Sequence, residues 1–382
     1  MTSSRNPSPH VVMVNLALVP GLRPEELLDR LPGIGRFSSS LAEAGARVTV
    51  LARAEADAEL RVGAVRLITV HGRDEPLAPL RHPSAELVGR LRQLSPDLVH
   101  LGGFLFPVPT AAVRTALPRR VPLLLQHHGE PPGNGRLGVL QRLLLRLADG
   151  ILVTSRGIAD EWVRSGHLPR RIAVHEVLEA STDLRPVPRV EARRMTGLDG
   201  DPAILWVGRL HPRKDPFTAL RAFEEALARL PDARLHMVYA EAPLLAELKG
   251  FVSARPPLVR AVRFVGHVPH AALADWYSAA DLFLTSSPAE GSNWALIEAM
   301  ACGLPAVATD IPANRRVAGE PASFFPPGDA HEGAAAIVQS GLRREPARHA
   351  LRDHFERRLS WSVVAREALQ AYTRAIALRA ES

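Results

Sequence analysis

The stretch at residues 285–305, T-S-S-P-A-E-G-S-N-W-A-L-I-E-A-M-A-C-G-L-P, decides the fold because it leads from an apolar run into a helical pattern. The run at 281–284 suits a buried parallel strand. Ser292 or Asn293 can cap the following helix, and a glycine and a proline end it. We therefore predict a strand-to-helix loop, the connection from which doubly wound α/β sheets are built.

Two carboxylates lie around the start of this helix, Glu290 in the loop and Glu298 in the early turns. A helix N-terminus attracts anions, so acids beside it suit a ligand with both phosphate and hydroxyl groups, such as a sugar nucleotide. At about 100° per residue, Glu298 points away from the stripe of Leu296 and Met300, so packing on the sheet does not require it. The alternative is a solvated loop acid and a helix-surface glutamate, and spacing does not choose between the two.

The run that begins at Glu290, E-G-S-N-W-A-L-I-E-A-M-A-C-G-L-P-A-V-A-T, resembles the signature of retaining nucleotide-sugar glycosyltransferases of family 4, which have the GT-B architecture. The resemblance implies that Glu290 contacts sugar hydroxyls and that Glu298 contacts the ribose. It also implies that backbone amides of Gly291, Ser292 and Asn293 hold the donor. The family more often has an aromatic-glycine-leucine turn at this point, so the departure leaves the donor sugar open.

Composition sets the class of protein. The 382 residues are enough for two domains, and 46% hydrophobic with 23% charged residues indicates a globular chain. No apolar run approaches the ~20 residues that span a bilayer, and the first ten residues lack the apolar core of a signal peptide, so we expect a cytoplasmic location. The single Cys302 cannot form an intramolecular disulfide, and we expect it to be buried. The net charge of +7 is spread thinly, which argues against nucleic acid as a partner.

In the first half, apolar runs at 10–19, 47–51, 65–70, 98–101 and 121–127 alternate with helical patterns such as 84–94, which predicts a doubly wound parallel sheet. Ligands of such sheets bind beyond the carboxyl ends of the strands, where His127 and His128 stand. A histidine at a strand end is often only structural. The family resemblance implies a sugar or phosphate contact for His128, with His127 as the alternative.

The segment that contains Gly33, Gly35 and Ser38 mimics a dinucleotide fingerprint, but Arg53 ends the second strand where an acid should hold the ribose. We therefore do not expect an NAD site. The resemblance implies instead that Gly35 belongs to the family's N-terminal glycine loop, which faces the donor phosphates and the acceptor, ahead of a helix at 37–44. Acceptor contacts are expected from residues 20–38 and 129–135.

The pattern at 137–147, L-G-V-L-Q-R-L-L-L-R-L, predicts a helix with arginines at its surface. Such a basic amphipathic helix can lie on an anionic membrane. Its apolar residues nearly encircle the axis, however, which favours a buried helix with arginines that reach the solvent. Peripheral membrane contact is therefore the less favoured interpretation.

The second half predicts strands at 203–207, 234–239, 262–265, 282–285, 306–309 and 323–325. The first is followed by G-R-L-H-P-R-K, after which Asp215 caps a helix that starts with a proline. Basic loop residues are usually only solvated. The resemblance to the family's G-R-L-x-x-x-K phosphate clamp implies that Gly208, Arg209 and Lys214 hold the donor diphosphate, through a bidentate guanidinium and a mobile ammonium.

Two further segments bear on the ligands. The sequence D-G-D-P at 199–202 matches a metal-binding D-x-D, but it precedes a strand and its glycine and proline read as a turn, so no metal is expected. The loop 266–269 resembles the family segment that contacts the nucleotide base through backbone groups, here at Val268. A final helix is predicted from Trp361 to about Leu378.

The resemblance implies a metal-independent retaining glycosyltransferase that has no cofactor and uses a nucleoside diphosphate sugar, a UDP-sugar, as co-substrate. Its acceptor is a small molecule, glycan or lipid. We expect an acceptor domain at 1–185, a nucleotide-sugar domain at 186–358 facing it across a cleft, and a helix at 359–382 that returns to the first domain. Glu290, His128, Arg209 and Lys214 form the expected catalytic set. The alternatives are a sugar-nucleotide epimerase or a phosphorylase of the same fold, and a non-catalytic nucleotide-sugar-binding protein.

Overall fold

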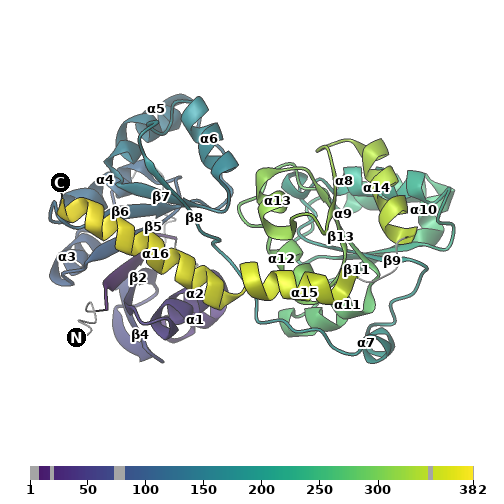
Figure 1. The fold of residues 1–382 in the computed structure, drawn as a ribbon, viewed down its shortest axis with the longest axis horizontal. Coiled ribbons are helices and arrows are strands. Elements are labelled where there is room, and N and C mark those ends of the chain that lie inside the picture. Colours follow the sequence, from purple (N-terminus) through teal and green to yellow (C-terminus); the bar gives the residue numbers. More distant parts are fainter. Residues whose placement is uncertain (1–7, 18–20, 73–81, 343–346, 382) are drawn as a thin grey trace, which may run out of the picture. The chain divides into compact units, whose positions relative to one another are not determined.

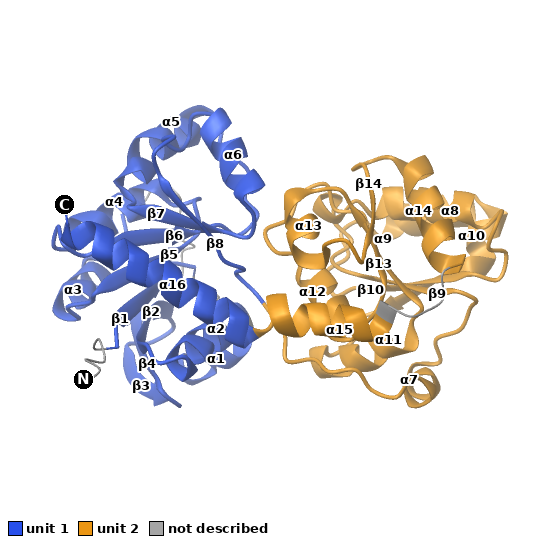
Figure 2. Cartoon of the chain, viewed as in Figure 1, with its two compact units in different colours: residues 1–180, 361–382 blue, residues 181–360 orange. Residues whose placement is uncertain are grey.

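The computed structural model describes residues 8–17, 21–72, 82–342 and 347–381. The chain forms two compact units (Figure 2). Unit 1 consists of residues 1–180 and 361–382, and unit 2 consists of residues 181–360. The end of the strand predicted at 10–19, and the start of the loop predicted to contact the acceptor, lie outside the described residues.

Unit 1 is built on an eight-stranded sheet in the order β3-β4-β2-β1-β5-β6-β7-β8. All neighbouring strands are parallel except β3, which pairs antiparallel with β4. Its strands are β1 (His10–Asn15), β2 (Arg47–Ala54), β3 (Ala58–Val62), β4 (Val65–His71), β5 (Leu98–Gly102), β6 (Leu123–Gln126), β7 (Gly150–Val153) and β8 (Ala173–Glu176). The predicted strands are confirmed. Strand β3 was not predicted, because its residues alternate between exposed and half-buried at the sheet edge and make no apolar run.

The helices of unit 1 connect these strands, except α16, which follows unit 2 in the chain (Figure 1). They are α1 (Leu27–Arg30), α2 (Pro32–Glu43), α3 (Ala85–Gln93), α4 (Pro107–Ala116), α5 (Gly135–Leu144), α6 (Arg156–Arg164) and α16 (Trp361–Ala380), with short 3-10 helices η1 (Pro24–Glu26) and η2 (Leu145–Leu147). The predicted helix at 84–94 is confirmed, and its Ser84 hydroxyl accepts a hydrogen bond from the Leu87 N–H, 3.2 Å away.

The last helix, α16, packs beside α2 in unit 1 (Figure 1). The Trp361 ring lies edge-on to Phe37 of α2, with 6.4 Å between ring centroids. The buried Tyr372 hydroxyl lies 2.7 Å from Nδ1 of His100 on β5. Burial lowers the pKa of His100 to about 3, so its imidazole is neutral and can hydrogen-bond to the phenol without carrying a charge.

The glycine segment expected to be a loop is helical. Helix α2 begins at Pro32, and the Gly35 N–H donates to the carbonyl oxygen of Leu31, 2.9 Å away. A Cβ atom on Gly35 would lie 2.0 Å from the carbonyl oxygen of Leu28 in α1. Gly35 is therefore needed for close packing of α2 on α1, and its amide is occupied within the helix. The expectation that Gly35 lies in a loop is therefore wrong, and its expected contact with the donor stays a prediction.

The expectation of a buried helix at 137–147 is also wrong. Helix α5 and η2 cover this segment, but Val139 and Leu143 are 54% and 58% exposed. The residues of α5 and η2 that are buried are Gly138, Gln141 and Leu145.

The orientation of α5 is explained by Gln141, a buried polar residue. A pattern of apolar residues does not predict that a glutamine is buried. Its amide nitrogen donates to the carbonyl oxygen of Phe104 at 3.1 Å, and its amide oxygen accepts from the Gly133 N–H at 2.7 Å. Because these backbone groups need partners, the glutamine turns inward and the opposite face of α5 turns to the solvent.

Unit 2 contains a six-stranded, wholly parallel sheet in the order β11-β10-β9-β12-β13-β14. Its strands are β9 (Ala203–Val207), β10 (Arg234–Val238), β11 (Val262–Gly266), β12 (Leu282–Thr285), β13 (Ala306–Thr309) and β14 (Ser323–Phe325). All six predicted strands are confirmed. The strand order reverses between β9 and β12, which pair directly with Leu205 opposite Phe283, so the ligand-binding crevice of such a sheet is expected beyond these two strands.

The helices of unit 2 are α7 (Arg189–Thr196), α8 (Pro216–Ala226), α9 (Leu245–Ser253), α10 (Pro256–Ala261), α11 (Leu273–Ala279), α12 (Trp294–Ala301), α13 (Pro312–Ala318), α14 (Ala330–Leu342) and α15 (Ala347–Arg358), with 3-10 helices η3 (Pro212–Lys214) and η4 (His270–Ala272). The apolar core of the unit lies between the sheet and its helices, around Trp206, Phe223 and Phe325. Within the described part of the chain, no helix is both long and apolar enough to cross a bilayer.

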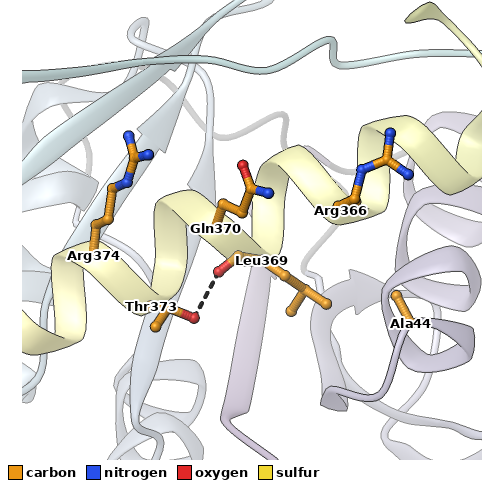
Figure 3. A pocket seen from close by; sticks show the side chains of 6 residues that line it. All are labelled: Ala44, Arg366, Leu369, Gln370, Thr373 and Arg374. Carbon is orange, nitrogen blue, oxygen red and sulfur yellow. Dashed lines mark hydrogen bonds between the residues drawn. The ribbon is translucent and has the colours of Figure 1, made fainter. Parts of the chain in front are cut away.

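A depression of about 570 Å³ lies in unit 1 along α16, lined by Ala44, Arg366, Leu369, Gln370, Thr373 and Arg374 (Figure 3). Ala44 follows the end of α2, just before β2 begins, so this hollow lies toward the amino ends of the strands. The Thr373 hydroxyl already donates to the carbonyl oxygen of Leu369 at 2.9 Å. Ligands of parallel sheets bind at the opposite, carboxyl ends, so this hollow is separate from the candidate site.

Candidate functional site

The candidate site begins where the loops after β9 and β12 meet, at the reversal of strand order in unit 2. Ser286, directly after β12, donates its hydroxyl to the carbonyl oxygens of Lys214 and Asp215, at 3.0 and 2.7 Å. Asp215 in turn has a left-handed backbone with φ of 41°, and its carboxylate accepts the Thr218 N–H at the start of α8. This confirms the predicted cap and fixes the lysine loop against the end of β12.

The two loops are also joined by an ion pair. The Lys214 ammonium contacts the Glu290 carboxylate, and the two side chains are only 21% and 13% exposed. Glu290 is therefore not a solvated loop acid. A half-buried ammonium held beside a carboxylate offers an anion and a hydroxyl group adjacent binding positions, which is the arrangement that a sugar diphosphate requires.

Glu298 lies in the middle of α12 and is buried. Its carboxylate accepts a hydrogen bond from the Tyr277 hydroxyl of α11 at 2.9 Å and lies 2.7 Å from Nε2 of His270 in η4. The alternative of a solvated helix-surface glutamate is therefore wrong. The hydrogen bond that the His270 ring donates to Glu298 outweighs burial and raises the pKa of His270. Burial and the Glu298 charge together raise the pKa of Tyr277 well above its usual range.

The turn before α12 is supported by a buried amide network. Asn293 takes the N-cap position with φ of 45°, but its side chain does not cap the helix. Its amide nitrogen donates instead to Asn314 Oδ1 at 2.8 Å, and Asn314 donates to the carbonyl oxygen and the hydroxyl of Thr309 at 2.9 and 3.0 Å. Gly291 and Ser292 are buried beside it. This network fixes the N-cap residue of α12. The first amides of a helix have no partner within the helix, so those of α12 are available to a ligand.

The other residues predicted to contact the donor lie around this centre. Gly208 follows β9 and donates its N–H to the carbonyl oxygen of Val238, 3.1 Å away. Arg209 is exposed and lies 3.6 Å from Glu241, also exposed, so that contact holds it weakly. Val268 is half-buried in the loop that leads from β11 to η4, two residues before His270. The structure thus brings Lys214 into direct contact with Glu290. Within the part of the chain that the structure describes, Arg209 makes no ion pair or hydrogen bond with either residue.

The two strand-end histidines of unit 1 differ in environment. His127 is buried between the rings of Phe104 and Trp162, and its Nε2 lies 2.9 Å from the carbonyl oxygen of Glu130. His128 keeps 48% of its side chain exposed and pairs through Nδ1 with Glu179. Burial acts against the charge of this ring, but the carboxylates of Glu179 and Glu130 raise the pKa of His128 overall. His128 is thus the more accessible of the two rings.

Several residues of this arrangement were not singled out from the sequence. Ser286 had a signal, since a serine directly after a buried strand lies at the ligand-binding edge of the sheet. His270 and Tyr277 had none, because their role depends on which face of α12 turns toward α11. Among the described residues, no group of three or more His, Cys, Asp or Glu side chains could hold a metal ion, and D-G-D-P forms the turn before β9. Cys302 is buried, as expected.

Comparison with known proteins gives the family. Residues 32–177 match the model of the glycosyl transferase 4-like domain, and residues 201–340 match that of glycosyl transferases group 1. The chain belongs to the family 4 glycosyltransferases. The two matches fall within units 1 and 2 respectively, and the fold of both units is the α/β fold of GT-B proteins.

Relatives of this glycosyltransferase include the D-inositol 3-phosphate glycosyltransferase 2 of Catenulispora acidiphila, 33% identical over 60% of this chain and 57% of that protein. The D-inositol 3-phosphate glycosyltransferase of Kribbella flavida is 30% identical over 64% of this chain and 60% of that protein. The chain therefore aligns with less than two thirds of the length of these relatives.

Solved structures with the same fold include sucrose-phosphate synthase from Thermosynechococcus elongatus, with a TM-score of 0.72, 20% identity, and coverage of 97% of this chain and 100% of that one. The Anabaena protein HepE, solved in complex with UDP, has a TM-score of 0.68 and 17% identity, and covers 96% of this chain and 100% of its own. At 20% and 17% identity, these similarities show a shared fold and nothing beyond it.

Proposed function

We propose that this protein is a retaining glycosyltransferase that moves a sugar from a nucleoside diphosphate sugar, specifically a UDP-sugar, to a hydroxyl acceptor. The observation that carries the proposal is the meeting of Lys214, Glu290 and the N-terminus of α12 at the strand-order reversal of unit 2. Matches of family 4 glycosyltransferase domains to both units support it. UDP in the HepE structure supports the choice of nucleotide.

In the proposed reaction, the bond between the anomeric carbon and the donor diphosphate breaks, and the acceptor oxygen bonds to the same face of the sugar. The proton of the acceptor hydroxyl passes to an oxygen of the departing diphosphate. Lys214 and Arg209 stabilise the charge that develops on the diphosphate, and each such contact is worth roughly 3 kcal/mol of barrier. Retention is supported by the resemblance of residues 290–309 to the signature of retaining enzymes.

The acids and the histidine take positioning roles in this proposal. Glu290 accepts hydrogen bonds from the sugar hydroxyls, and its pairing with Lys214 places the sugar beside the diphosphate. Glu298, held by Tyr277 and His270, accepts the ribose hydroxyls. Backbone groups of Gly208, Val268, Gly291, Ser292 and Asn293 hold the phosphates and the base. His128 contacts the sugar or a phosphate, for which an exposed ring with a raised pKa is suited.

The test is turnover of UDP-sugars with an acceptor panel in the presence of EDTA, with Lys214→Ala and Glu290→Ala beside the parent protein. We expect the parent to release UDP and a glycosylated product without added metal, and each variant to lose at least about 100-fold in rate, consistent with one lost electrostatic contact. Unchanged rates in both variants would rule out the assigned roles. A free new sugar formed without acceptor would identify an epimerase, and nucleotide binding without turnover a binding protein.

A further inference from the structure

Helix α5 of unit 1 has an exposed apolar face that the proposed transfer reaction does not use. Val139, Leu143 and Leu147 are spaced four residues apart, so they form one stripe along α5 and η2. Their exposed fractions are 54%, 58% and 38%. The stripe lies on the side of the helix opposite its buried residues, so it does not pack in the core of unit 1.

Arginines flank this stripe on the same exposed side. We define the α5 face as the three apolar residues together with the exposed arginines of α5 and η2: Val139, Leu143, Leu147, Arg136, Arg142 and Arg146. None of these arginines takes part in an ion pair or side-chain hydrogen bond within the described residues. Arginines with partners elsewhere in unit 1, such as Arg114 and Arg379, are held by Asp149 instead.

The surroundings of the α5 face carry little negative charge. Residues 131–148 contain no aspartate or glutamate. Asp149, directly after this segment, is neutralised by its two arginine partners. The preceding Glu130 is buried and accepts the backbone N–H groups of Phe104 and His128. The face therefore combines exposed apolar side chains with a local positive charge that is not compensated.

We propose that the α5 face binds the surface of a bilayer that contains anionic lipids. A helix with apolar side chains between arginines lies in the plane of the interface, with the apolar residues among the acyl chains and the guanidinium groups at the phosphates. The complementary charge favours an anionic lipid surface over a neutral one. The buried Gln141 anchors the helix to unit 1 through Phe104 and Gly133, so the face is presented by a rigid element.

The first experiment is co-sedimentation of the full chain with vesicles of phosphatidylcholine alone or of phosphatidylcholine mixed with the anionic lipid phosphatidylglycerol. We expect binding to the anionic vesicles, weakened by salt, and little binding to the neutral ones. Arg142→Gln with Arg146→Gln should weaken binding about 25-fold, because each cation near an anionic surface contributes about fivefold. The matched control is Val190→Ser on α7, another exposed valine beside arginines, which should bind like the parent.

The second experiment reports where the membrane touches the protein. Cys302 is the single cysteine and is buried, and burial raises the pKa of its thiol to about 12, so a thiol-reactive fluorophore labels an introduced cysteine selectively. A polarity-sensitive dye on Leu143→Cys should shift to the blue with anionic vesicles, whereas the same dye on Val190→Cys should not.

Three results would overturn the proposal: no binding of the parent to anionic vesicles, equal binding by the double arginine variant, or binding without a blue shift at position 143. Both measurements are independent of sugar transfer. A failure here leaves the proposed function untouched, and a failure of that function leaves this binding surface in place.

Discussion

Removal of one oxygen atom tests how Glu298 is held. In the Tyr277→Phe variant the buried Glu298 carboxylate loses the hydroxyl that donates to it at 2.9 Å from a fully buried phenol. A hydrogen bond to a charged group contributes about 1.5–3 kcal/mol to stability, so we expect a loss of that size. For a unit of 180 residues this corresponds to a fall in Tm of about 3–12 °C.

The matched control is Tyr239→Phe in the same unit. Tyr239 is half-buried, and its hydroxyl makes no side-chain hydrogen bond within the described residues, so the same deletion should change stability by less than about 0.5 kcal/mol. Urea unfolding followed by circular dichroism, with thermal scans of the same samples, measures both variants. Equal effects of Tyr277→Phe and Tyr239→Phe would refute the idea that the phenol holds the glutamate.

Three further predictions concern other residues. Gly35→Ala should destabilise unit 1 by about 1–3 kcal/mol in urea unfolding, because its Cβ would meet backbone at 2.0 Å, whereas Gly89→Ala, with open space around it in α3, should be neutral or stabilising. The raised pKa of His270 means that its pairing with Glu298 adds stability below the ordinary pKa of 6.5 and loses it as pH rises through the raised value. His270→Ala should therefore have its largest stability deficit at low pH, and a deficit that grows with pH would contradict this. Cys302 should stay unreactive toward a thiol reagent at pH 8 until the protein unfolds, since burial raises its pKa to about 12.

The fold could be predicted from the sequence where strands are buried on both faces. The strands of unit 2 carry continuous apolar runs such as A-I-L-W-V at 203–207, and parallel sheets covered by helices require such runs. The edge strand β3 could not be found in this way because only alternate residues are covered. The cap at Asp215 was predictable because a capping side chain acts locally, on an amide three residues away.

The site could be predicted in part. Glu290 and Lys214 lie 76 positions apart in the chain, so no local pattern places them together. The resemblance of their motifs to the family predicts a shared site, and the pairing of β9 with β12 brings the two loops together. Gly35 was misjudged because a glycine needed for helix packing and one needed for a phosphate loop look alike in a sequence. The orientation of α5 depended on Gln141, whose partners are backbone groups that carry no sequence signal.

The most direct test of the central claim is a calorimetric titration of UDP into the parent protein, Lys214→Met and Lys249→Met. Lys249 lies exposed on α9 of the same unit, so its variant removes an equal charge away from the proposed site. We predict that the parent and Lys249→Met bind UDP alike and that Lys214→Met binds at least roughly 10-fold more weakly, as the loss of a charge-assisted hydrogen bond implies. Equal affinity of all three proteins for UDP, or no binding by the parent, would contradict a diphosphate site at the ends of β9 and β12.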